Sequence, residues 1–403
     1  MKRLADVVNF NADASCLPAV TWLGALAGGD DSVMCRWLRG FVEHEKRVSL
    51  GIVGSTVADM ALLNPESIVL INRHREIFEL ILRPYSHDIA LLRSPEGFAL
   101  NLELGRAVIS SEFDRVTPYL LAPEFMLTNE QLAELARQGI AGTFINSGRF
   151  SSSVAARIPD HPYQLTGLFG TTLDCVPVVH ALTDAYLQSL HDWESSAWNA
   201  RVRCCRDEAL CSWRDGESWL FVPDGLLREH AWLAGESREI ERVFVRDLVG
   251  DAKFEDPTLA GPQACTSYPV HSFADWVGEF RMFGFLRRLM DLERRLPTLS
   301  REERLCWLQA ANSDVLSVVE KVSPTIRIRT RPPGAPSCEE LEWQIRRSER
   351  GFEGEEYLAI AEHYSASEEI RRYVAESTQP HIAKLRARIG YFSCDRLAAA
   401  GLE

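Results

Sequence analysis

Short apolar runs alternate with segments of helical periodicity along most of the chain. Strands are predicted at residues 6–11, 47–53, 78–82, 117–122, 142–146, 218–222 and 268–274. Segments with the period of an amphipathic helix lie between them, most clearly at residues 128–138, 178–193 and 278–295. An alternation of strand and helix repeated about seven times predicts a parallel α/β sheet or barrel.

The helix predicted after residue 128 has the clearest ends. Thr128 is a good N-cap residue and Gln131 follows three positions later, so the pair forms the sequence signature of a capping box. Gly139 is a typical C-terminal stop.

Strand signals nearly vanish after residue 301. A basic, proline-rich stretch covers residues 327–336, and the remainder is charged with helical periodicity. The sequence therefore predicts a barrel over residues 1–300 and a helical C-terminal subdomain over residues 301–403.

Composition and charge narrow the class of protein. Of 403 residues, 46% are hydrophobic and 25% charged, which suits an ordinary globular protein. The net charge of −13 repels phosphate backbones and anionic lipids, so neither nucleic acid nor a membrane surface is expected as a partner. No signal-peptide or transmembrane pattern is visible, and the ten cysteines are scattered, which favours a reducing cytoplasm with free thiols.

Several common site motifs are incomplete. The glycines of residues 24–30 lack the Lys-Ser/Thr of a phosphate loop, and no two histidines are three or four positions apart. Cys204, Cys205 and Cys211 have no fourth partner at zinc-site spacing, and a G-x-S-x-G nucleophile elbow is missing. We therefore expect no metal and no cofactor.

Three ionisable residues follow predicted strand ends, where parallel barrels carry their functional side chains. Glu124 follows PYLLAP, Asp275 follows HSFA, and His87 follows FELILRPYS. Two carboxylates facing one cavity can cleave a glycosidic bond, one as nucleophile or base and the other as proton donor. A single strand-end carboxylate can equally be a solvated loop residue or a helix cap.

Five segments in order resemble the motifs of the α-amylase-like enzymes of glycoside hydrolase family 57. They lie between residue 5 and about residue 320 and read RVSLGIVGSTVADMALLNPESIVLI, FELILRPYSHDIALLRSPEGF, VTPYLLAPEFMLTNEQLAELARQGIAGTFI, HSFADWVGEF and RLCWLQAANSD. The resemblance implies an incomplete TIM-like barrel of the (β/α)7 type, a helical C-terminal region, and retaining action on α-glucans.

The same resemblance implies roles for individual residues. Glu124 matches the catalytic nucleophile and Asp275 the general acid/base. The remaining matches, and some of their neighbours, are expected to bind substrate. They are Asn11, Asp13, Glu79, His87, Trp276, Trp307 and Asp314.

The chain departs from the family at three sugar-contacting positions. Asn11-Ala12-Asp13 replaces the first H-Q-P motif, and Val315 stands where the last motif has histidine. Leu121-Ala122-Pro123 replaces the R-N-T before the nucleophile. Each lost hydrogen-bonding group weakens a glucose subsite by about 1 to 3 kcal/mol where it is buried and charged, so starch is expected to be a poor substrate.

These departures leave two main hypotheses. The first is a retaining glycoside hydrolase or glycosyltransferring enzyme that acts on an oligo- or polysaccharide with α-linkages and altered specificity. The alternative is a non-catalytic relative that binds a glycan or a protein partner on a glycosidase scaffold. An unrelated α/β barrel enzyme is a third possibility.

Overall fold

A computed structural model describes most of the barrel region and a few positions beyond it. The described residues are 1–11, 26, 29–146, 161–168, 170–216, 219, 224–248, 253–254, 287, 289–291, 293–299, 304, 307–308 and 311. All structural statements below concern these residues.

One mainly parallel sheet organises the molecule. Its strands are β1 (Lys2–Phe10), β2 (Val48–Ile52), β3 (Phe78–Leu82), β4 (Val116–Leu120), β5 (Gly142–Asn146), β6 (Tyr163–Leu168), β7 (Thr171–Val178), β8 (Ala209–Asp215), β9 (Ile240–Arg242) and β10 (Lys253–Phe254). Their order is β10-β6-β7-β5-β4-β3-β2-β1-β8, and β9 pairs with the start of β1. The β6–β7 pairing is antiparallel, and β10 pairs parallel with β6, so β6 and β10 run opposite to the other described strands.

The sheet curls into an incomplete barrel. β8 and β7, which would have to pair to close it, form no ladder. They approach each other closely enough that the backbone N–H of Val179, just after β7, donates to the carbonyl of Cys211 in β8 at 2.9 Å. The α/β fold and the incomplete barrel expected from the sequence are confirmed.

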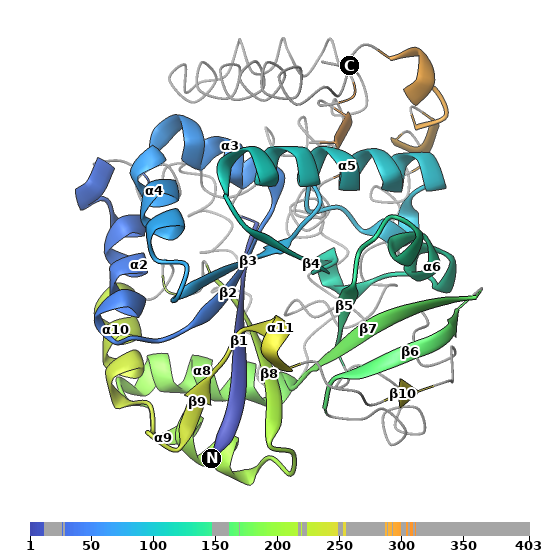
Figure 1. The fold of residues 1–403 in the computed structure, drawn as a ribbon. Coiled ribbons are helices and arrows are strands. Elements are labelled where there is room, and N and C mark those ends of the chain that lie inside the picture. Colours follow the sequence, from blue (N-terminus) through green and yellow to red (C-terminus); the bar gives the residue numbers. More distant parts are fainter. Residues whose placement is uncertain are drawn as a thin grey trace, which may run out of the picture.

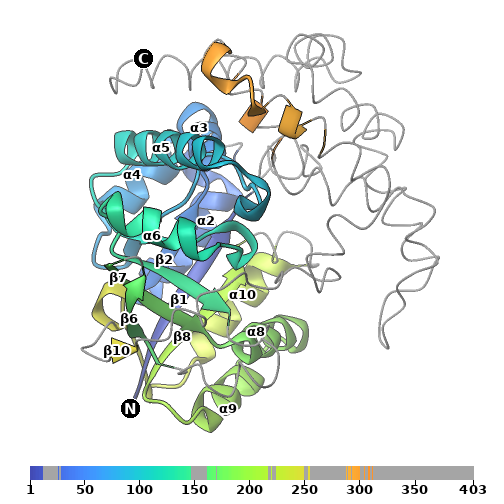
Figure 2. The same ribbon diagram turned by 90° about the vertical axis from the view of Figure 1, so that its right-hand side faces the viewer.

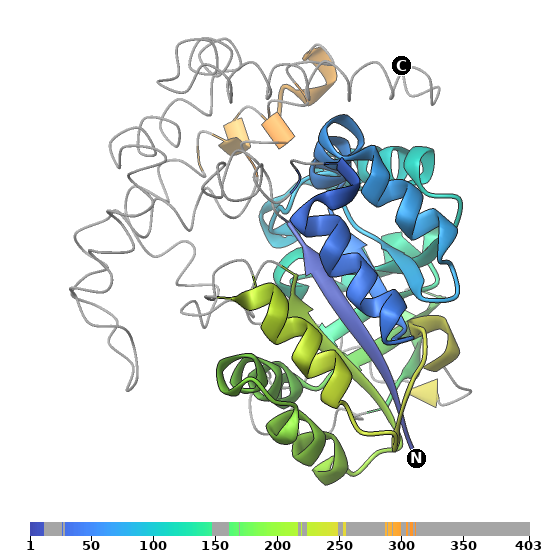
Figure 3. The same cartoon turned by 90° about the vertical axis from the view of Figure 1, so that its left-hand side faces the viewer.

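Helices surround the strands (Figure 1). They are α2 (Val33–Glu43), α3 (Gly54–Leu63), α4 (Pro65–Arg73), α5 (Pro95–Glu112), α6 (Asn129–Arg137), α8 (His180–Asp192), α9 (Ser196–Cys204), α10 (Gly225–Gly235) and α11 (Val245–Leu248). Figure 2 shows α3 and α5 at one end of the sheet and α8 and α9 at the other. Figure 3 shows α2 and α4 side by side, with the yellow-green α10 next to α2.

Side chains point alternately to the two faces of each strand, and they form two separate hydrophobic cores. Inward residues of β1 and β8, such as Val7 and Trp213, pack in a small cluster inside the barrel. Outward residues of the same strands, such as Val8, join the larger core beneath the helices. A fully buried charged network also lies on this outer side, where Arg214 of β8 pairs with Asp6 of β1 at 3.2 Å and with Glu229 of α10 at 2.8 Å.

The first half of the chain follows the sequence prediction closely. The first five predicted strands correspond to β1–β5, and the helix predicted at residues 178–193 corresponds to α8. The capping box of α6 is present, with both Thr128 and Gln131 contributing, and Gly139 has a left-handed φ of 75°. The sequence reading missed β6 to β10.

Several predictions lie outside the described residues. They include the strand at 268–274, nearly all of the strand at 218–222, the first part of the helix at 278–295 and most of the subdomain at 301–403. The division into two domains therefore stays a prediction. Within the described part, no helix combines the length and the hydrophobicity needed to cross a lipid bilayer.

Candidate functional site

The carboxyl ends of the parallel strands meet at one rim of the barrel. Four buried or half-buried polar residues lie there. Asn9 is near the end of β1, Arg83 follows β3, Glu124 follows β4, and Asp215 is the last residue of β8. In parallel barrels this rim is the one that is open to ligand.

Side chains alternate in direction along β8, and this alternation points Asp215 towards the inside of the rim. Cys211 and Trp213 belong to the cluster inside the barrel, so Asp215, two positions further on, faces the same way. In the parallel ladder Asp215 lies opposite Asn9, and the Asn9 amide Nδ2 donates to Asp215 Oδ1 at 3.0 Å. The next backbone N–H, that of Gly216, donates to the Asn9 carbonyl at 2.6 Å and fixes the strand end.

Glu124 lies on a strained corner. It belongs to the short 3-10 turn η3 (Pro123–Phe125), and both Glu124 (φ 53°, ψ 14°) and Phe125 (φ 55°) are left-handed. That conformation costs a residue other than glycine roughly 1–2 kcal/mol. The Phe125 ring packs edge-on against Trp213, with centroids 5.6 Å apart, which ties the corner to β8. Backbone strain of this kind is concentrated at functional sites.

The environment of Asp215 changes its acidity. Burial is the main cause that raises the pKa of Asp215, to about 6, and the negative charge of Glu124 raises it further. The hydrogen bond from Asn9 and the positive charge of Arg83 act in the opposite direction. A carboxyl group with such a pKa is protonated in a useful fraction near neutral pH, as a general acid must be.

Arg83 connects this pair with His87. Its guanidinium Nη1 donates to the carbonyl of Leu121 at the end of β4 at 2.6 Å. Burial, followed by the positive charge of Arg83, lowers the pKa of His87 well below its ordinary value. The imidazole is therefore neutral at physiological pH, and its ring can both donate and accept hydrogen bonds. Asn11 also reaches the rim, since its Oδ1 accepts from Asn9 Nδ2 at 3.2 Å.

Glu79 lies towards the opposite end of the barrel from this group. It is the second residue of β3, and its carboxylate accepts hydrogen bonds from Ser49 Oγ (2.6 Å), Thr117 Oγ1 (2.7 Å) and the Val245 N–H (2.9 Å). These contacts join β2, β3, β4 and α11. The structure gives Glu79 a role in joining strands and does not bring it together with Glu124.

Trp307 packs behind the loop that carries His87. Its indole N–H donates to the Leu289 carbonyl at 3.1 Å, and Arg93 lies over its ring at 5.5 Å. Arg93 also pairs with Asp88 (2.7 Å) and Glu293 (3.5 Å), and the three side chains are between 1% and 5% exposed. Trp307 therefore belongs to a buried junction in which Leu289 and Glu293 also take part.

The other predicted site residues, Asp13, Asp275, Trp276 and Asp314, lie outside the described residues, and their roles stay predictions. Sequence reasoning missed Asn9, Arg83 and Asp215. A signal for Asp215 exists, because the alternating apolar residues of ALCSW end in the turn-forming pair Asp215-Gly216.

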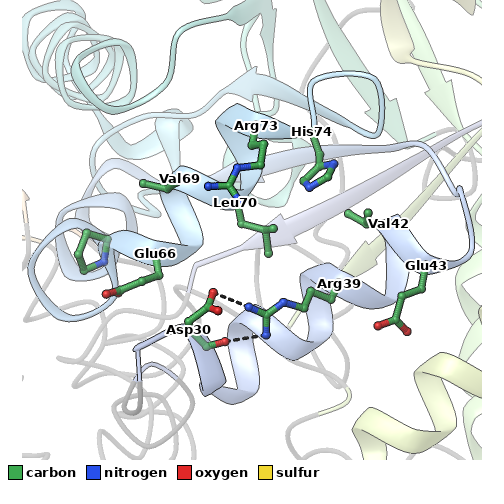
Figure 4. Close-up of a pocket in the computed structure, with 10 residues that line it drawn as sticks. Asp30, Arg39, Val42, Glu43, Glu66, Val69, Leu70, Arg73 and His74 are labelled. Atoms are coloured by element: carbon green, nitrogen blue, oxygen red, sulfur yellow. Dashed lines mark hydrogen bonds and ion pairs between the residues drawn. The ribbon is translucent and has the colours of Figure 1, made fainter.

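The described residues offer no group of three or more His, Cys, Asp or Glu side chains arranged to hold a metal ion. A groove of about 580 Å³ lies away from the rim, between α2 and α4 (Figure 4). Charged side chains line its walls, among them Arg39 and Asp30, which pair with each other, together with the apolar side chains of Val42, Val69 and Leu70. No residue of the rim contributes to it.

Comparisons with known proteins agree with this fold. No family model and no curated protein matches the chain. Among solved structures, a GH57-type branching enzyme from Pyrococcus horikoshii matches with a TM-score of 0.63 and 8% identity, over 100% of this chain and 97% of the other. A GH57 branching enzyme from Thermococcus kodakaraensis, in complex with glucose, matches with a TM-score of 0.61 and 10% identity, over 97% and 94%.

A third similar structure is a 4-alpha-glucanotransferase from Thermococcus litoralis, with a TM-score of 0.54 and 13% identity. The match covers 77% of this chain, which spans only about half (53%) of the transferase. At these identities the likeness concerns the fold, which is GH57-like.

Proposed function

We propose that this chain is a retaining glycoside hydrolase or glycosyltransferring enzyme that acts on an α-linked oligo- or polysaccharide. The observation that carries the proposal is the pair of Glu124 and Asp215 at the barrel rim. One of them sits on a strained backbone corner and the other is a carboxyl group with a pKa of about 6. The GH57-like fold and the order of the five sequence motifs support the same chemistry.

The proposed mechanism is a double displacement. The Glu124 carboxylate attacks the anomeric carbon while protonated Asp215 gives its proton to the leaving oxygen, and a covalent glycosyl-enzyme forms. Asp215, now a carboxylate, takes a proton from water or from an acceptor sugar hydroxyl, which releases Glu124. This sequence requires the two carboxyl groups to lie about 5 to 5.5 Å apart when substrate is bound.

In this mechanism Asp215 is the general acid/base, which is the role that the resemblance to glycoside hydrolase family 57 implies for Asp275. Asp215 is in a described strand and close enough to Glu124 for the two charges to interact. Asp275 lies outside the described residues, so experiment has to decide between the two.

Substrate contacts are proposed for the uncharged polar groups beside the pair. Neutral His87 is a proposed hydrogen-bonding partner of a sugar hydroxyl, and Asn11 reaches the same rim through Asn9. The substituted first motif, Asn11-Ala12-Asp13, supports altered specificity, with slow or no hydrolysis of starch. Two carboxylates cleave glycosides without a metal or redox group, so the mechanism includes no cofactor.

The decisive experiment tests which carboxyl group is the nucleophile and which is the general acid. Glu124→Gln, Asp215→Asn and Asp275→Asn would be assayed on maltooligosaccharides and on aryl α-glycosides, whose phenolate leaves without protonation. Glu124→Gln should abolish turnover of both substrate types. Asp215→Asn should lose on the order of 10²- to 10⁴-fold on the oligosaccharide and much less on the aryl glycoside.

The exposed carboxylate of Asp184, which is 71% exposed on α8, supplies a matched control, and Asp184→Asn should behave as wild type. If Asp275→Asn shows the acid pattern and Asp215→Asn does not, the acid assignment is wrong. If wild-type protein binds glycans but turns over none of them, the chain is the non-catalytic relative suggested by its substituted motif.

A further inference from the structure

Trp193 is an unusual surface residue outside the rim. It follows α8 directly and 43% of its surface is exposed. Its backbone is left-handed (φ 60°, ψ 24°), a conformation that glycine usually supplies at the end of a helix. A large aromatic residue gains nothing from this position by packing in the core, so its placement calls for another explanation.

A neighbouring helix holds the indole in place. The guanidinium of Arg228, on α10, lies over the ring at 4.5 Å from its centroid. Arg228 Nη1 in turn donates to the carbonyls of Leu190 (2.8 Å) and His191 (2.7 Å) at the end of α8. The ring is therefore fixed before any ligand arrives, which reduces the entropy lost on binding. Figures 1 and 2 show α8 and α10 next to each other.

The two residues before Trp193 in the chain carry polar side chains. His191 Nδ1 and Asp192 Oδ1 are 2.9 Å apart, and their side chains are 87% and 41% exposed. The hydrogen bond from His191 lowers the pKa of Asp192, which keeps this carboxylate ionised as a hydrogen-bond acceptor. We call Trp193, Arg228, His191 and Asp192 the Trp193 platform.

We infer that the Trp193 platform binds a pyranose ring of a glycan chain, at a site separate from the catalytic rim. A pyranose has a flat face of C–H groups and a rim of hydroxyls. The indole matches the face, and the charged neighbours match the hydroxyls. The inference rests on the proposed action on glycans for its choice of ligand, but it does not require that the chain cleaves them.

A protein partner fits this surface less well. Stable protein interfaces bury more than about 1,000 Å² around an apolar centre that is poor in charge. Here Arg228 lies over the exposed indole, the preceding residues His191 and Asp192 are polar, and Asp184, on the same helix, is 71% exposed.

Native electrophoresis through gels that contain soluble starch, glycogen or a β-glucan tests the inference. The Glu124→Gln background prevents digestion of the polymer, so binding is read without turnover. We expect this protein to be retarded in at least one gel, and Trp193→Ala to raise the dissociation constant about five- to tenfold. Trp193→Tyr should restore most of the retardation because it keeps an aromatic face.

Leu187→Ala is the matched control, since Leu187 is 45% exposed on the same helix but is not part of the platform. It should migrate like the parent. Arg228→Lys should give an intermediate loss, which can be read even if Trp193→Ala folds poorly. The inference is wrong if none of the three polymers retards the parent, or if Trp193→Ala and Arg228→Lys are both retarded as strongly as the parent. Retardation of the parent together with no turnover of any glycan by the wild-type protein would instead overturn only the proposed enzymatic function.

Discussion

The buried junction of Asp88, Arg93 and Glu293 allows a quantitative prediction about stability. Arg93→Met keeps the length of the side-chain stem but leaves two buried carboxyl groups without their shared cation. Removing one partner from a buried ion pair costs about 3–5 kcal/mol. With an unfolding entropy of about 2.1 cal/mol/K per residue, 403 residues give about 0.8 kcal/mol/K, so the melting temperature should fall by about 4–6 °C at pH 7.

The loss should depend on pH. Burial raises the pKa of Asp88 to about 6, so this carboxyl group destabilises the fold above pH 6 and is relieved by protonation as the pH falls. At pH 5 Asp88 is mostly protonated in the folded protein, so burying it without the Arg93 cation costs less free energy. The difference in melting temperature between Arg93→Met and wild type should therefore shrink.

Thermal unfolding followed by circular dichroism at pH 7 and pH 5 measures both effects. Arg137→Met is the control, because Arg137 forms an exposed pair with Glu134 that contributes less than about 1 kcal/mol. A loss below 1 °C at pH 7, or an equal loss at both pH values, would refute the argument from buried charge.

Three further predictions concern the site and the thiols. If protonated Asp215 is the acid, kcat/KM should fall about tenfold per pH unit above pH 6; a flat profile from pH 6 to pH 8 would contradict this. Gly216→Ala would place a methyl group 2.5 Å from the Phe10 ring, so chemical denaturation should show about 1–3 kcal/mol lost, and activity should drop with it. Iodoacetamide should label exposed Cys204 in the native protein and Cys211 only after unfolding, because burial raises the pKa of Cys211 well above its ordinary value; peptide mass mapping would show equal labelling if this is wrong.

The sequence was informative where local signals and burial coincide. β2 and β3 are fully buried strands, so each reads as a short apolar run of the expected length. The ends of α6 were visible because Thr128 and Gln131 each accept a hydrogen bond from the other's backbone N–H, and Gly139 takes up a left-handed backbone conformation. These features do not depend on distant parts of the chain.

Asp215, the proposed partner of Glu124, has only a weak local signal, the turn-forming pair Asp215-Gly216 at the end of β8. β8 carries Ser212, Arg214 and Asp215, which look like a polar loop until β1 supplies Asp6 and Asn9 as their partners. Those partners are about two hundred residues away in the sequence. Periodicity cannot reveal a strand whose polar residues find their partners on remote elements.

The place of β1 between β2 and β8 has a consequence for synthesis of the protein. β1 leaves the ribosome about two hundred residues before β8, yet it pairs with β8 along seven residues, beginning with Arg3 opposite Ala209, and then with β9 at residue 240. At about 5–20 residues per second the nascent strand waits on the order of 10–40 s for β8. During that time its apolar residues and one unpaired edge are exposed, which is the condition that favours aggregation and chaperone binding. Translation speed through the first two hundred or so residues should therefore affect the yield of folded protein more than changes further along the message.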